Sequence, residues 1–360
     1  MVPEAQQRPF VTVAYADLLY LSARLLEHAG CPRPTAETVA AFFVEADLRG
    51  VGVQGVDYLP LILRNLRNGM IKPEAKPRIM KDKGACVLVD GGGGFGQIAS
   101  VFAADVAVER AREFGVGVVG IHDAYDVYML GVYAARMAER DTIGIVMSTG
   151  ASLVHPYGGT ERRLSTNPLA FGIPRGANAP IIFDMSTSAL SNARIRHAAY
   201  HGEQVPRGSG LTVDGRPTTN PREIQRGAIS PLAGHKGFGL AICVAMLCGP
   251  LTASSIGKSL AGWYDDPEGD TGPMGHFFMA IDPSKFLPIE EFKQRAEDYI
   301  EEIKGSRLAP GFTEIRIPGE RQYKCKQESL KKGARILQAT WKNLIRIAEE
   351  SGVPVKQIPS

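Results

Sequence analysis

The 360-residue sequence has no large excess of charge of either sign. It holds 41 Lys and Arg residues against 38 Asp and Glu residues, which gives a formal net charge of +3 at pH 7. Proteins that bind nucleic acids or anionic membrane surfaces usually carry a clear basic excess. The composition therefore argues against both as the main partner.

Cysteine is scarce, and its spacing is irregular. The five cysteines are scattered, and no two of them form a CxxC pair. This is typical of free thiols in a reducing compartment and argues against a disulfide framework. No apolar run approaches the roughly 20 residues of a membrane-spanning helix, and the start MVPEAQQRPF does not resemble a secretion signal. We therefore expect a cytoplasmic protein.

The histidines do not indicate a metal site. There are seven, and only His197 and His201 have a spacing that could place two ligands on one helix face. A zinc site needs three or four ligands, and no acidic residue or cysteine of clear register lies near this pair. We interpret the pair as part of a polar helix face and predict no bound metal.

The composition that remains is that of a globular protein, with 44% hydrophobic residues and room for a sizeable core. Apolar residues at helical spacing predict helices between residues 12 and 69. From residue 85 onward, short β-rich runs such as ACVLVD and VGVVGI alternate with helical segments, and helical patterns return after residue 288. This alternation predicts a mixed α/β body with helical segments at both ends.

A glycine-rich run could bind a phosphate group. The sequence VLVDGGGGFGQ fits the pattern G-x-G-x-x-G through Gly91, Gly93 and Gly96, between an apparent strand and an apparent helix. Asp123 ends the next apparent strand, where an acidic residue could bind a ribose. The alternative is a glycine turn that only begins a helix. The spacing alone leaves both interpretations open.

Four other segments resemble landmarks of one family of nicotinamide enzymes. They are LSTNPLAFGIP (164–174), IIFDMSTSAL (181–190), PLAGHKGFGLAICVAMLCGPLTAS (231–254) and IPGE (317–320). In these segments the sequence resembles the malate/L-lactate dehydrogenase type 2 family. That family includes ureidoglycolate and sulfolactate dehydrogenases, diketogulonate reductase and cyclic-imine carboxylate reductases. The resemblance runs in consistent order from about residue 10 to about residue 350.

The resemblance implies an α/β fold without a Rossmann domain. We expect an N-terminal helical segment (1–75), an NAD(P)-binding mixed α/β domain (76–287) and a C-terminal helical segment (288–360) that packs with the N-terminal part. The run from Gly91 to Gly96 would then be a turn. The resemblance further implies a homodimer, a small-molecule substrate and NAD(P)H as cofactor, without distinguishing NADH from NADPH.

The same resemblance implies which residues bind the cofactor. They are Ser148, Thr166, Asn167, Asp184, Met185, Ser186, His235, Lys236, Pro318, Gly319 and Glu320. The chemistry of the run GHKGFGLA supports part of this set, because its glycines permit close approach and its cations lie near a helix start. A solvated helix start, capping of a helix by Asp184 and a turn before Pro168 are the alternatives.

The reaction centre departs from the family pattern. Relatives carry an Asn-His-Phe-Gly run in the stretch that here reads GIHDAYDVYMLG, and the family histidine falls on Asp126 rather than on His122. Relatives also carry Ser-His-Gly followed shortly by an arginine that anchors the substrate carboxylate. At those positions this sequence has Val53, Gln54, Gly55 and Tyr58.

These replacements change the chemistry that we expect. Reduction of a ketone needs an acid for the developing alkoxide, and the neutral Gln54 cannot supply that proton. A protonated imine already carries its proton, and the carboxylate of Asp126 favours such a cation. Loss of the arginine, with Tyr58 in its place, argues against a simple 2-oxo acid. We therefore predict an NAD(P)H-dependent oxidoreductase that reduces a C=N bond or another non-standard small substrate.

Other interpretations of the altered centre remain open. In a conventional 2-oxo acid reductase the acid would be relocated, and we rank Asp126 first, then Tyr128 and then His122. Asp184, which faces the reaction centre in the family, completes the predicted catalytic set. Asp126 could instead be a surface loop residue, and the chain could be a cofactor-binding scaffold that is inactive or serves non-redox catalysis.

Overall fold

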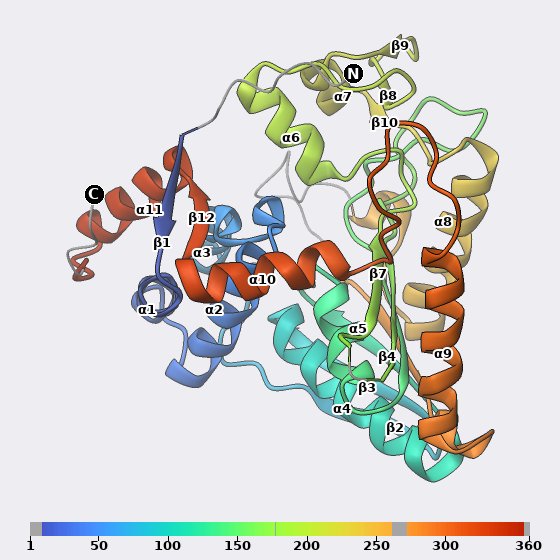
Figure 1. The fold of residues 1–360 in the computed structure, drawn as a ribbon. Coiled ribbons are helices and arrows are strands. Elements are labelled where there is room, and N and C mark those ends of the chain that lie inside the picture. Colours follow the sequence, from blue (N-terminus) through green and yellow to red (C-terminus); the bar gives the residue numbers. More distant parts are fainter. Residues whose placement is uncertain (1–8, 177, 261–271, 356–360) are drawn as a thin grey trace. The chain divides into compact units, whose positions relative to one another are not determined.

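The computed structural model describes residues 9–176, 178–260 and 272–355. The chain divides into two compact units (Figure 1). The helical unit comprises Met1–Glu74 and Glu320–Ser360, and the sheet unit comprises Ala75–Gly319. Each unit is described by itself.

The helical unit is built from both ends of the chain. Its elements are β1 (Phe10–Val13), α1 (Tyr15–His28), α2 (Arg33–Leu48), the 3-10 turns η1 (Gly52–Gln54) and η2 (Val56–Tyr58), α3 (Leu59–Arg67), α10 (Glu320–Lys332), β12 (Ala334–Leu337) and α11 (Gln338–Glu350). The helices bury their apolar faces together, and the largest fully buried side chains include Leu18, Phe43 and Ile62. The predicted helical domain made from N- and C-terminal segments is confirmed.

A two-stranded sheet in this unit differs from the prediction of continuous helix. β1 pairs antiparallel with β12, and Val13 lies opposite Ala334. Gly333 ends the preceding helix at φ +95°, and a Cβ atom there would lie 2.7 Å from the side chain of Thr12. Helical periodicity could not reveal this strand because its partner lies at the other end of the chain.

The sheet unit contains a seven-stranded mixed sheet. The strand order is β2 (Arg78–Lys83), β3 (Cys86–Gly94), β4 (Val116–Ala124), β11 (His276–Ile281), β5 (Ile143–Ser148), β6 (Leu169–Ile173) and β7 (Ile181–Met185). Only β3 and β4 run parallel. A Rossmann sheet is mostly parallel, so the predicted non-Rossmann α/β fold is confirmed. The glycine run that we expected to form a turn lies largely within β3.

Helices cover both faces of this sheet. On one face lie α4 (Gly96–Phe114) and α5 (Gly131–Ala138), and on the other lies α8 (His235–Cys248). Side chains alternate along β11. Phe278 meets Tyr133 of α5 edge to face at 5.9 Å, whereas the adjacent Phe277 shares a buried cluster with Val244 and Cys248 of α8.

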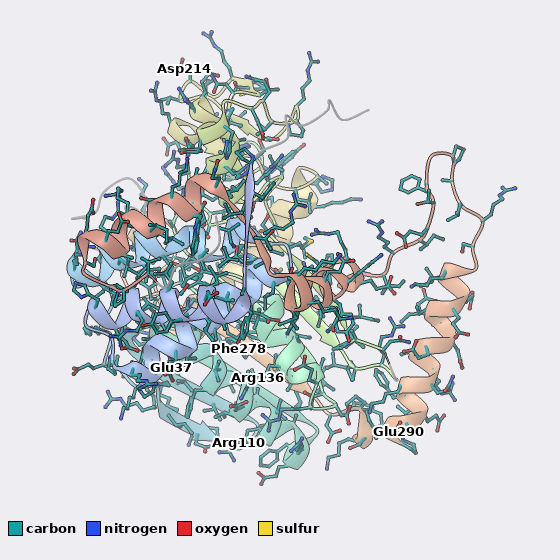
Figure 2. The ribbon with its side chains drawn as sticks, turned by 60° about the vertical axis from the view of Figure 1, so that its left-hand side comes forward. Glu37, Arg110, Arg136, Asp214, Phe278 and Glu290 are labelled. Carbon is teal, nitrogen blue, oxygen red and sulfur yellow. The ribbon has the colours of Figure 1, made fainter. Side chains whose placement is uncertain are left out.

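Charged pairs join the helices of the first face. Arg136 of α5, which Figure 2 labels, donates to both carboxylate oxygens of Asp105 on α4 at 2.8 Å. Such a bidentate pair fixes the relative rotation of two helices better than a single contact does. Because α5 begins directly after the loop that follows β4, this pairing also anchors the far end of that loop.

A smaller subdomain follows β7. Its elements are α6 (Asn192–His201), β8 (Gly210–Leu211), β9 (Pro217–Thr218), α7 (Pro221–Arg226) and β10 (Ala228–Ile229). They pack around a buried cluster that includes Ile195, Ile224 and Ala241. Because Ala241 belongs to α8, this cluster ties the subdomain to the start of that helix. His197 and His201 lie side by side on α6, and the described residues hold no group of three potential metal ligands.

Helix α9 (Ile289–Lys304) corrects the predicted domain boundary at residue 288. Residues 288–319 belong to the sheet unit, not to the helical unit. Arg175 donates to both oxygens of Glu297 at 2.7 Å, and Lys293 lies 2.8 Å from Asp141. The amphipathic pattern of this segment predicted a helix correctly, but such a pattern is the same whichever unit the helix packs against.

One segment qualifies by length and composition as a membrane span, contrary to the expectation from the sequence. The stretch His235–Thr252 has a mean hydropathy of 1.3, and 39% of it is buried in the protein. A 14-residue helix such as α8 rises only about 21 Å, whereas the hydrocarbon core of a bilayer is roughly 30 Å thick. The packing of α8 on the sheet accounts for one side of its apolar surface.

Candidate active site

The loop between β4 and α5, residues 125–130, is called here the reaction-centre loop. Asp126 lies in it, and its Oδ1 accepts a hydrogen bond from the Tyr128 N–H at 3.2 Å. Burial of the carboxyl group raises the pKa of Asp126, and the N–H groups of Tyr128 and Val127 oppose that rise only in part. The loop thus holds a carboxyl group that keeps its proton more readily than an ordinary aspartic acid.

The backbone of this loop is unusual at Tyr128. Its φ is +55°, in the left-handed region that bulky residues rarely adopt. Such conformations persist only where surrounding contacts impose them, and they are frequent at functional sites. Tyr133 of α5 supplies one such contact, because its hydroxyl donates to the Val127 carbonyl at 3.1 Å.

Asp184, at the end of β7, holds the far end of the reaction-centre loop. Its Oδ2 accepts from the Gly131 N–H at 2.7 Å, and the Leu130 N–H also donates to it. Burial raises the pKa of Asp184 to about 6. Asp184 therefore does cap a helix, as one alternative from the sequence proposed. The helix is α5, and the capping carboxylate comes from the distant strand β7.

His276, at the start of β11, holds the near end of the loop and was not predicted as a site residue. Its Nε2 lies 3.1 Å from the Tyr125 carbonyl oxygen, and its Nδ1 lies 2.9 Å from the Ser148 hydroxyl. The side chain has no exposed surface. A polar residue that opens the apolar run HFFMAI was the available signal, because a buried polar group needs partners.

His122 lies apart from these contacts. It is on β4 opposite Asp90 of β3, and its Nδ1 lies 3.3 Å from the Ser254 hydroxyl. The Gly92 N–H and Arg78 lower the pKa of Asp90 although burial acts to raise it. His122 therefore has a negatively charged neighbour and a hydroxyl partner, neither of which belongs to the reaction-centre loop.

Hydrogen bonds join three of the predicted cofactor segments. Both the N–H and the hydroxyl of Thr187 donate to the Thr166 carbonyl at 2.9 Å. The Thr187 carbonyl accepts from the Leu232 N–H at 2.9 Å, two residues before the glycine that caps α8. The segment of Asp184, Met185 and Ser186 thus lies between the Ser165–Pro168 turn and the start of α8.

Two of the predicted cofactor residues are engaged inside the protein. Asn167 is fully buried, accepts from the Thr149 hydroxyl at 3.0 Å and donates to the Ala241 carbonyl at 2.9 Å. Ser148 is only 2% exposed, and its hydroxyl meets His276. Their side chains therefore support the walls of the site, which leaves the backbone of these segments as the part that can face a ligand.

The start of α8 presents two cations. His235 and Lys236 are exposed, and Lys236 forms no hydrogen bond or ion pair with any residue that the structure describes. The preceding Gly234 has φ +64° and offers no capping side chain. The helix dipole repels cations near a helix N-terminus. An anion at the same place is attracted both by the dipole and by the cations. This arrangement can bind a phosphate group.

The Pro318 segment runs beside β7. The Pro318 carbonyl accepts from the Ile182 N–H at 3.2 Å. Gly319 has φ +93°, and a Cβ atom there would lie 2.9 Å from the Ile182 nitrogen. Glycine is therefore required for this approach. Glu320, the last of the three predicted residues, begins α10 in the helical unit.

Gln54 and Tyr58 end the two 3-10 turns of the helical unit, and Asp47 holds these turns. Asp47 Oδ2 accepts from the Val56 N–H at 2.8 Å, and a Cβ atom on Gly55 would collide with the Asp47 carboxylate. Burial raises the pKa of Asp47 to about 8. The Oε1 atom of Gln54 is buried and has no hydrogen-bond partner among the described residues. Asp47 was not among the predicted site residues.

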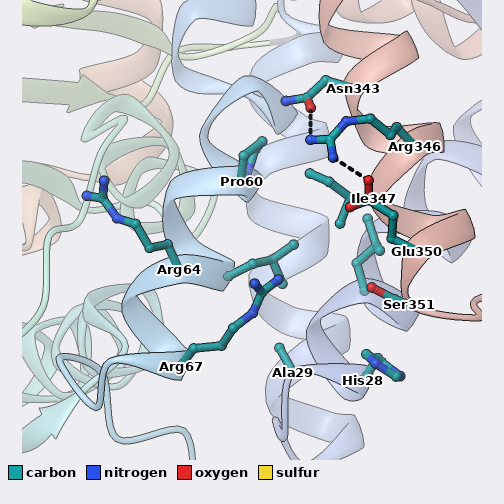
Figure 3. Close-up of a pocket in the computed structure, with 12 residues that line it drawn as sticks. His28, Ala29, Pro60, Arg64, Arg67, Asn343, Arg346, Ile347, Glu350 and Ser351 are labelled. Atoms are coloured by element: carbon teal, nitrogen blue, oxygen red, sulfur yellow. Dashed lines mark hydrogen bonds and ion pairs between the residues drawn. The ribbon is translucent and has the colours of Figure 1, made fainter.

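A cavity of about 670 Å³ also lies in the helical unit (Figure 3). It is lined by residues of α1, α3 and α11 and by none of the predicted site residues. Arg67 and His28 occupy last turns of helices, where cations are stabilised by the helix dipole. Figure 3 shows Arg346 already joined to Asn343 and Glu350. These charges have structural explanations without a ligand.

Comparison with known proteins identifies the family. A family model described as malate/L-lactate dehydrogenase matches residues 13–345. The chain belongs to the malate/L-lactate dehydrogenase family. A malate/(S)-sulfolactate dehydrogenase of Methanothermus fervidus is 32% identical over 333 residues, which are 92% of this chain and 96% of the relative.

Solved structures of the malate/L-lactate dehydrogenase family have the same fold. Malate dehydrogenase from Entamoeba histolytica superposes with a TM-score of 0.91 at 26% identity, and the match covers 98% of this chain and all of the other. Delta1-piperideine-2-carboxylate reductase from Pseudomonas syringae superposes with a TM-score of 0.85 at 30% identity, over 94% of this chain and all of the other. The family therefore contains proteins named for 2-hydroxy acids and proteins named for a cyclic imine.

Proposed function

We propose that this protein reduces a C=N bond of a small cyclic imine with hydride from NAD(P)H. Membership of the malate/L-lactate dehydrogenase family makes it an NAD(P)-dependent oxidoreductase. Family membership alone does not choose between C=O and C=N substrates, because relatives named for both match most of the chain. The observation that carries the proposal is the half-buried carboxyl group of Asp126 on the reaction-centre loop, whose pKa desolvation raises.

The raised pKa of Asp126 gives it two roles in sequence. A carboxyl group that retains its proton can pass it to the nitrogen of a neutral imine. The resulting carboxylate then stabilises the positive charge of the protonated imine, which becomes the better hydride acceptor.

The cofactor, when bound, supplies the hydride. His235 and Lys236 would hold its phosphates at the start of α8, because the unfavourable placement of two cations there is relieved by an anion. The Asp184 segment, at the end of β7, and the Pro318 segment, which bonds to β7, would line its remaining length. Ser148, Thr166 and Asn167 would support the nicotinamide end through the hydrogen bonds that join their segments.

The test compares the wild type with Asp126→Asn. The substrates are Δ1-pyrroline-2-carboxylate and Δ1-piperideine-2-carboxylate on one side, and pyruvate and oxaloacetate on the other. We expect efficient reduction of the imines by wild type and a loss of about 100-fold or more in kcat for the variant, because it lacks both the proton and the counter-charge. Efficient reduction of pyruvate or oxaloacetate, unchanged in Asp126→Asn, would contradict the proposal.

Asp123→Asn is the matched control for this experiment. Asp123 lies three residues earlier, at φ +53°. Asparagine accepts this left-handed conformation about as well as aspartate does. The control therefore removes one negative charge from the same stretch without disturbing its backbone, and we expect kcat with the imines to stay within about twofold of wild type.

A conventional 2-oxo acid reductase is the second candidate, favoured by the relatives named for malate and sulfolactate. It requires an acid in place of the histidines, and after Asp126 the next choice is Tyr128 on the reaction-centre loop. In that case Tyr128→Phe lowers 2-oxo acid reduction by about 100-fold. In the imine mechanism Asp126 supplies the proton, so Tyr128→Phe lowers the rate of imine reduction much less.

We also propose that the protein is a homodimer. The face of α8 turned away from the sheet exposes several large apolar side chains, namely Leu240 (44%), Ile242 (37%) and Met246 (46%), followed by Leu251 (58%). A second copy of the chain can cover this face with the identical face, as in a twofold dimer. Sedimentation of wild type and Met246→Glu tests this, and a monomeric wild type would contradict it.

A further inference from the structure

His276 is a buried histidine that joins the sheet to the reaction-centre loop. We propose that His276 is a positioning residue, which fixes the start of that loop through the Tyr125 carbonyl and does not carry the proton of the reaction. Its catalytic importance rests on the proposed function of Asp126 in the same loop. Its structural role can be measured without any substrate.

The hydrogen bonds assign the tautomer of this imidazole. Nε2 lies 3.1 Å from the Tyr125 carbonyl oxygen, and a carbonyl oxygen can only accept, so Nε2 carries the hydrogen. In the neutral ring Nδ1 is then an acceptor, and the Ser148 hydroxyl, 2.9 Å away, donates to it. Both nitrogens are engaged with the protein, and the Ser148 hydroxyl also lies 3.1 Å from the Thr149 carbonyl oxygen, which competes for the same hydrogen.

The surroundings of His276 exclude it as a substitute for the missing histidines. Burial lowers its pKa to about 4, although the carbonyl groups of Tyr125 and Ala124 act in the opposite direction. The ring is therefore neutral at physiological pH. A proton carrier has to titrate near the working pH and reach the substrate, whereas this side chain has no exposed surface.

The reaction-centre loop is held at both of its ends. His276 holds the Tyr125 carbonyl at the start, and Asp184 holds the Gly131 N–H at the finish. Between these two anchors lies Asp126. The hydrogen bonds that affect the pKa of its carboxylate come from the N–H groups of Val127 and Tyr128, which belong to the same loop. The position of this carboxyl group therefore depends on where the backbone is placed by these two anchors, by the Tyr133 hydroxyl on the Val127 carbonyl, and by the Tyr125 N–H, which donates to the Gly94 carbonyl at 2.9 Å.

Helix α4 limits how the loop can respond to a lost anchor. A Cβ atom on Gly96, the first residue of α4, would collide with the carbonyl oxygens of Tyr125 and Asp126. The loop backbone is thus already in close contact with α4 on that side. Release of the Tyr125 carbonyl can move the loop only away from this contact, and misplacement of a reacting group by about 1 Å can lower a rate by roughly 100-fold.

Two substitutions separate the two hydrogen bonds of the ring. The amide of glutamine lies about where Nε2 lies in histidine, so His276→Gln keeps a donor for the Tyr125 carbonyl. The shorter asparagine reaches only the position of Nδ1, so His276→Asn keeps a group beside Ser148 and loses the donor to Tyr125. We expect His276→Asn to lower kcat with Δ1-pyrroline-2-carboxylate by about 10- to 100-fold while the KM for NAD(P)H stays within about twofold.

His276→Gln is expected to retain most of kcat, and neither variant should shift the pH dependence of kcat. Hydrogen exchange in a peptide that spans residues 125–130 provides the readout that needs no substrate. Exchange there should be faster in His276→Asn and close to wild type in His276→Gln.

His155→Leu serves as a matched control for general destabilisation. His155 is also buried, and its ring bonds a carbonyl oxygen, that of Pro156 at 2.8 Å, and a hydroxyl, that of Ser230 at 3.0 Å. Pro156 lies in the segment between β5 and β6, and Ser230 follows β10 shortly before α8, so neither partner belongs to the reaction-centre loop. The control should lower Tm without changing hydrogen exchange in residues 125–130.

The outcomes distinguish the inference from the proposed function. Equal kcat and equal exchange in His276→Asn and His276→Gln would overturn the positioning role. A shifted pH dependence of kcat in His276→Gln would show that His276 titrates during the reaction, which would overturn its assignment as a neutral ring. If the wild type reduces no imine but exchange follows the expected order, the proposed function fails and the positioning role stands. If it reduces imines and exchange does not follow that order, the inference alone fails.

Discussion

Replacement of Asp47 by asparagine should stabilise the protein, and more so as the pH rises. Asp47 is 5% exposed, and its carboxylate accepts a hydrogen bond from the Val56 N–H at 2.8 Å. Burial, together with the charge of Asp57, raises its pKa from the ordinary 3.8 to about 8. The folded protein therefore prefers the protonated form, which the unfolded chain loses above pH 4.

The sign and size of the effect follow from proton linkage. A carboxyl group with a raised folded-state pKa contributes its full stability below pH 4 and loses it as the pH rises to about 8. At about 1.36 kcal/mol per pH unit, the upper limit of this loss is roughly 6 kcal/mol. Asparagine does not ionise, and its amide oxygen still accepts from Val56, so Asp47→Asn escapes the loss.

The assay is urea unfolding of wild type and variant at several pH values between 4.5 and 8.5. We expect nearly equal free energies of unfolding at the acidic end and an advantage of several kcal/mol for Asp47→Asn at the alkaline end. Asp57→Asn is the control, because Asp57 is exposed and bonds the Thr340 hydroxyl. A difference that does not depend on pH, or a variant less stable than wild type at pH 8, would refute the reasoning.

Two further substitutions probe the sheet unit. Asp184→Ala removes the carboxylate that caps α5, so it should lower the free energy of unfolding by about 1 to 2 kcal/mol. It should also speed hydrogen exchange at the Gly131 N–H. Unchanged exchange at Gly131 would count against the capping role. Lys236→Ala should raise the Kd of NADPH or NADH by about tenfold, since one charge-assisted phosphate contact is lost, and equal affinities measured by titration calorimetry would remove Lys236 from the cofactor site.

The parts of the fold that could be predicted from sequence depend on local pattern. Alternating strands and helices between β3 and α8 follow from apolar periodicity, whereas the altered positions Gln54 and Asp126, which rest on the resemblance, stay a prediction. Two features did not follow from local pattern. They are the pairing of β1 with β12 and the attachment of α9 through Arg175 and Glu297. Both depend on partners distant in sequence, which periodicity does not contain.

The supporting residues of the site escaped prediction for a related reason. His276 gave only the weak signal of a polar residue at the start of an apolar strand, and Asp47 lies within a helix whose pattern it does not interrupt. Their importance is visible only when the Tyr125 carbonyl and the Val56 N–H are seen beside them. Asp184 was noticed because it ends a strand, yet its partner Gly131 lies 53 residues away.

The energetics of these supporting residues bear on whether the protein is an inactive scaffold. Asp47 and Asp184 hold carboxyl groups with pKa values raised to about 8 and about 6. Burying such groups costs stability at neutral pH, and apolar or amide side chains of similar volume would avoid that cost. Each one nevertheless fixes backbone next to a residue of the predicted reaction centre, namely the turn that carries Gln54 and the loop that carries Asp126. A frame of this kind has a use where the side chains it positions still react, so the geometry favours a changed reaction over a lost one.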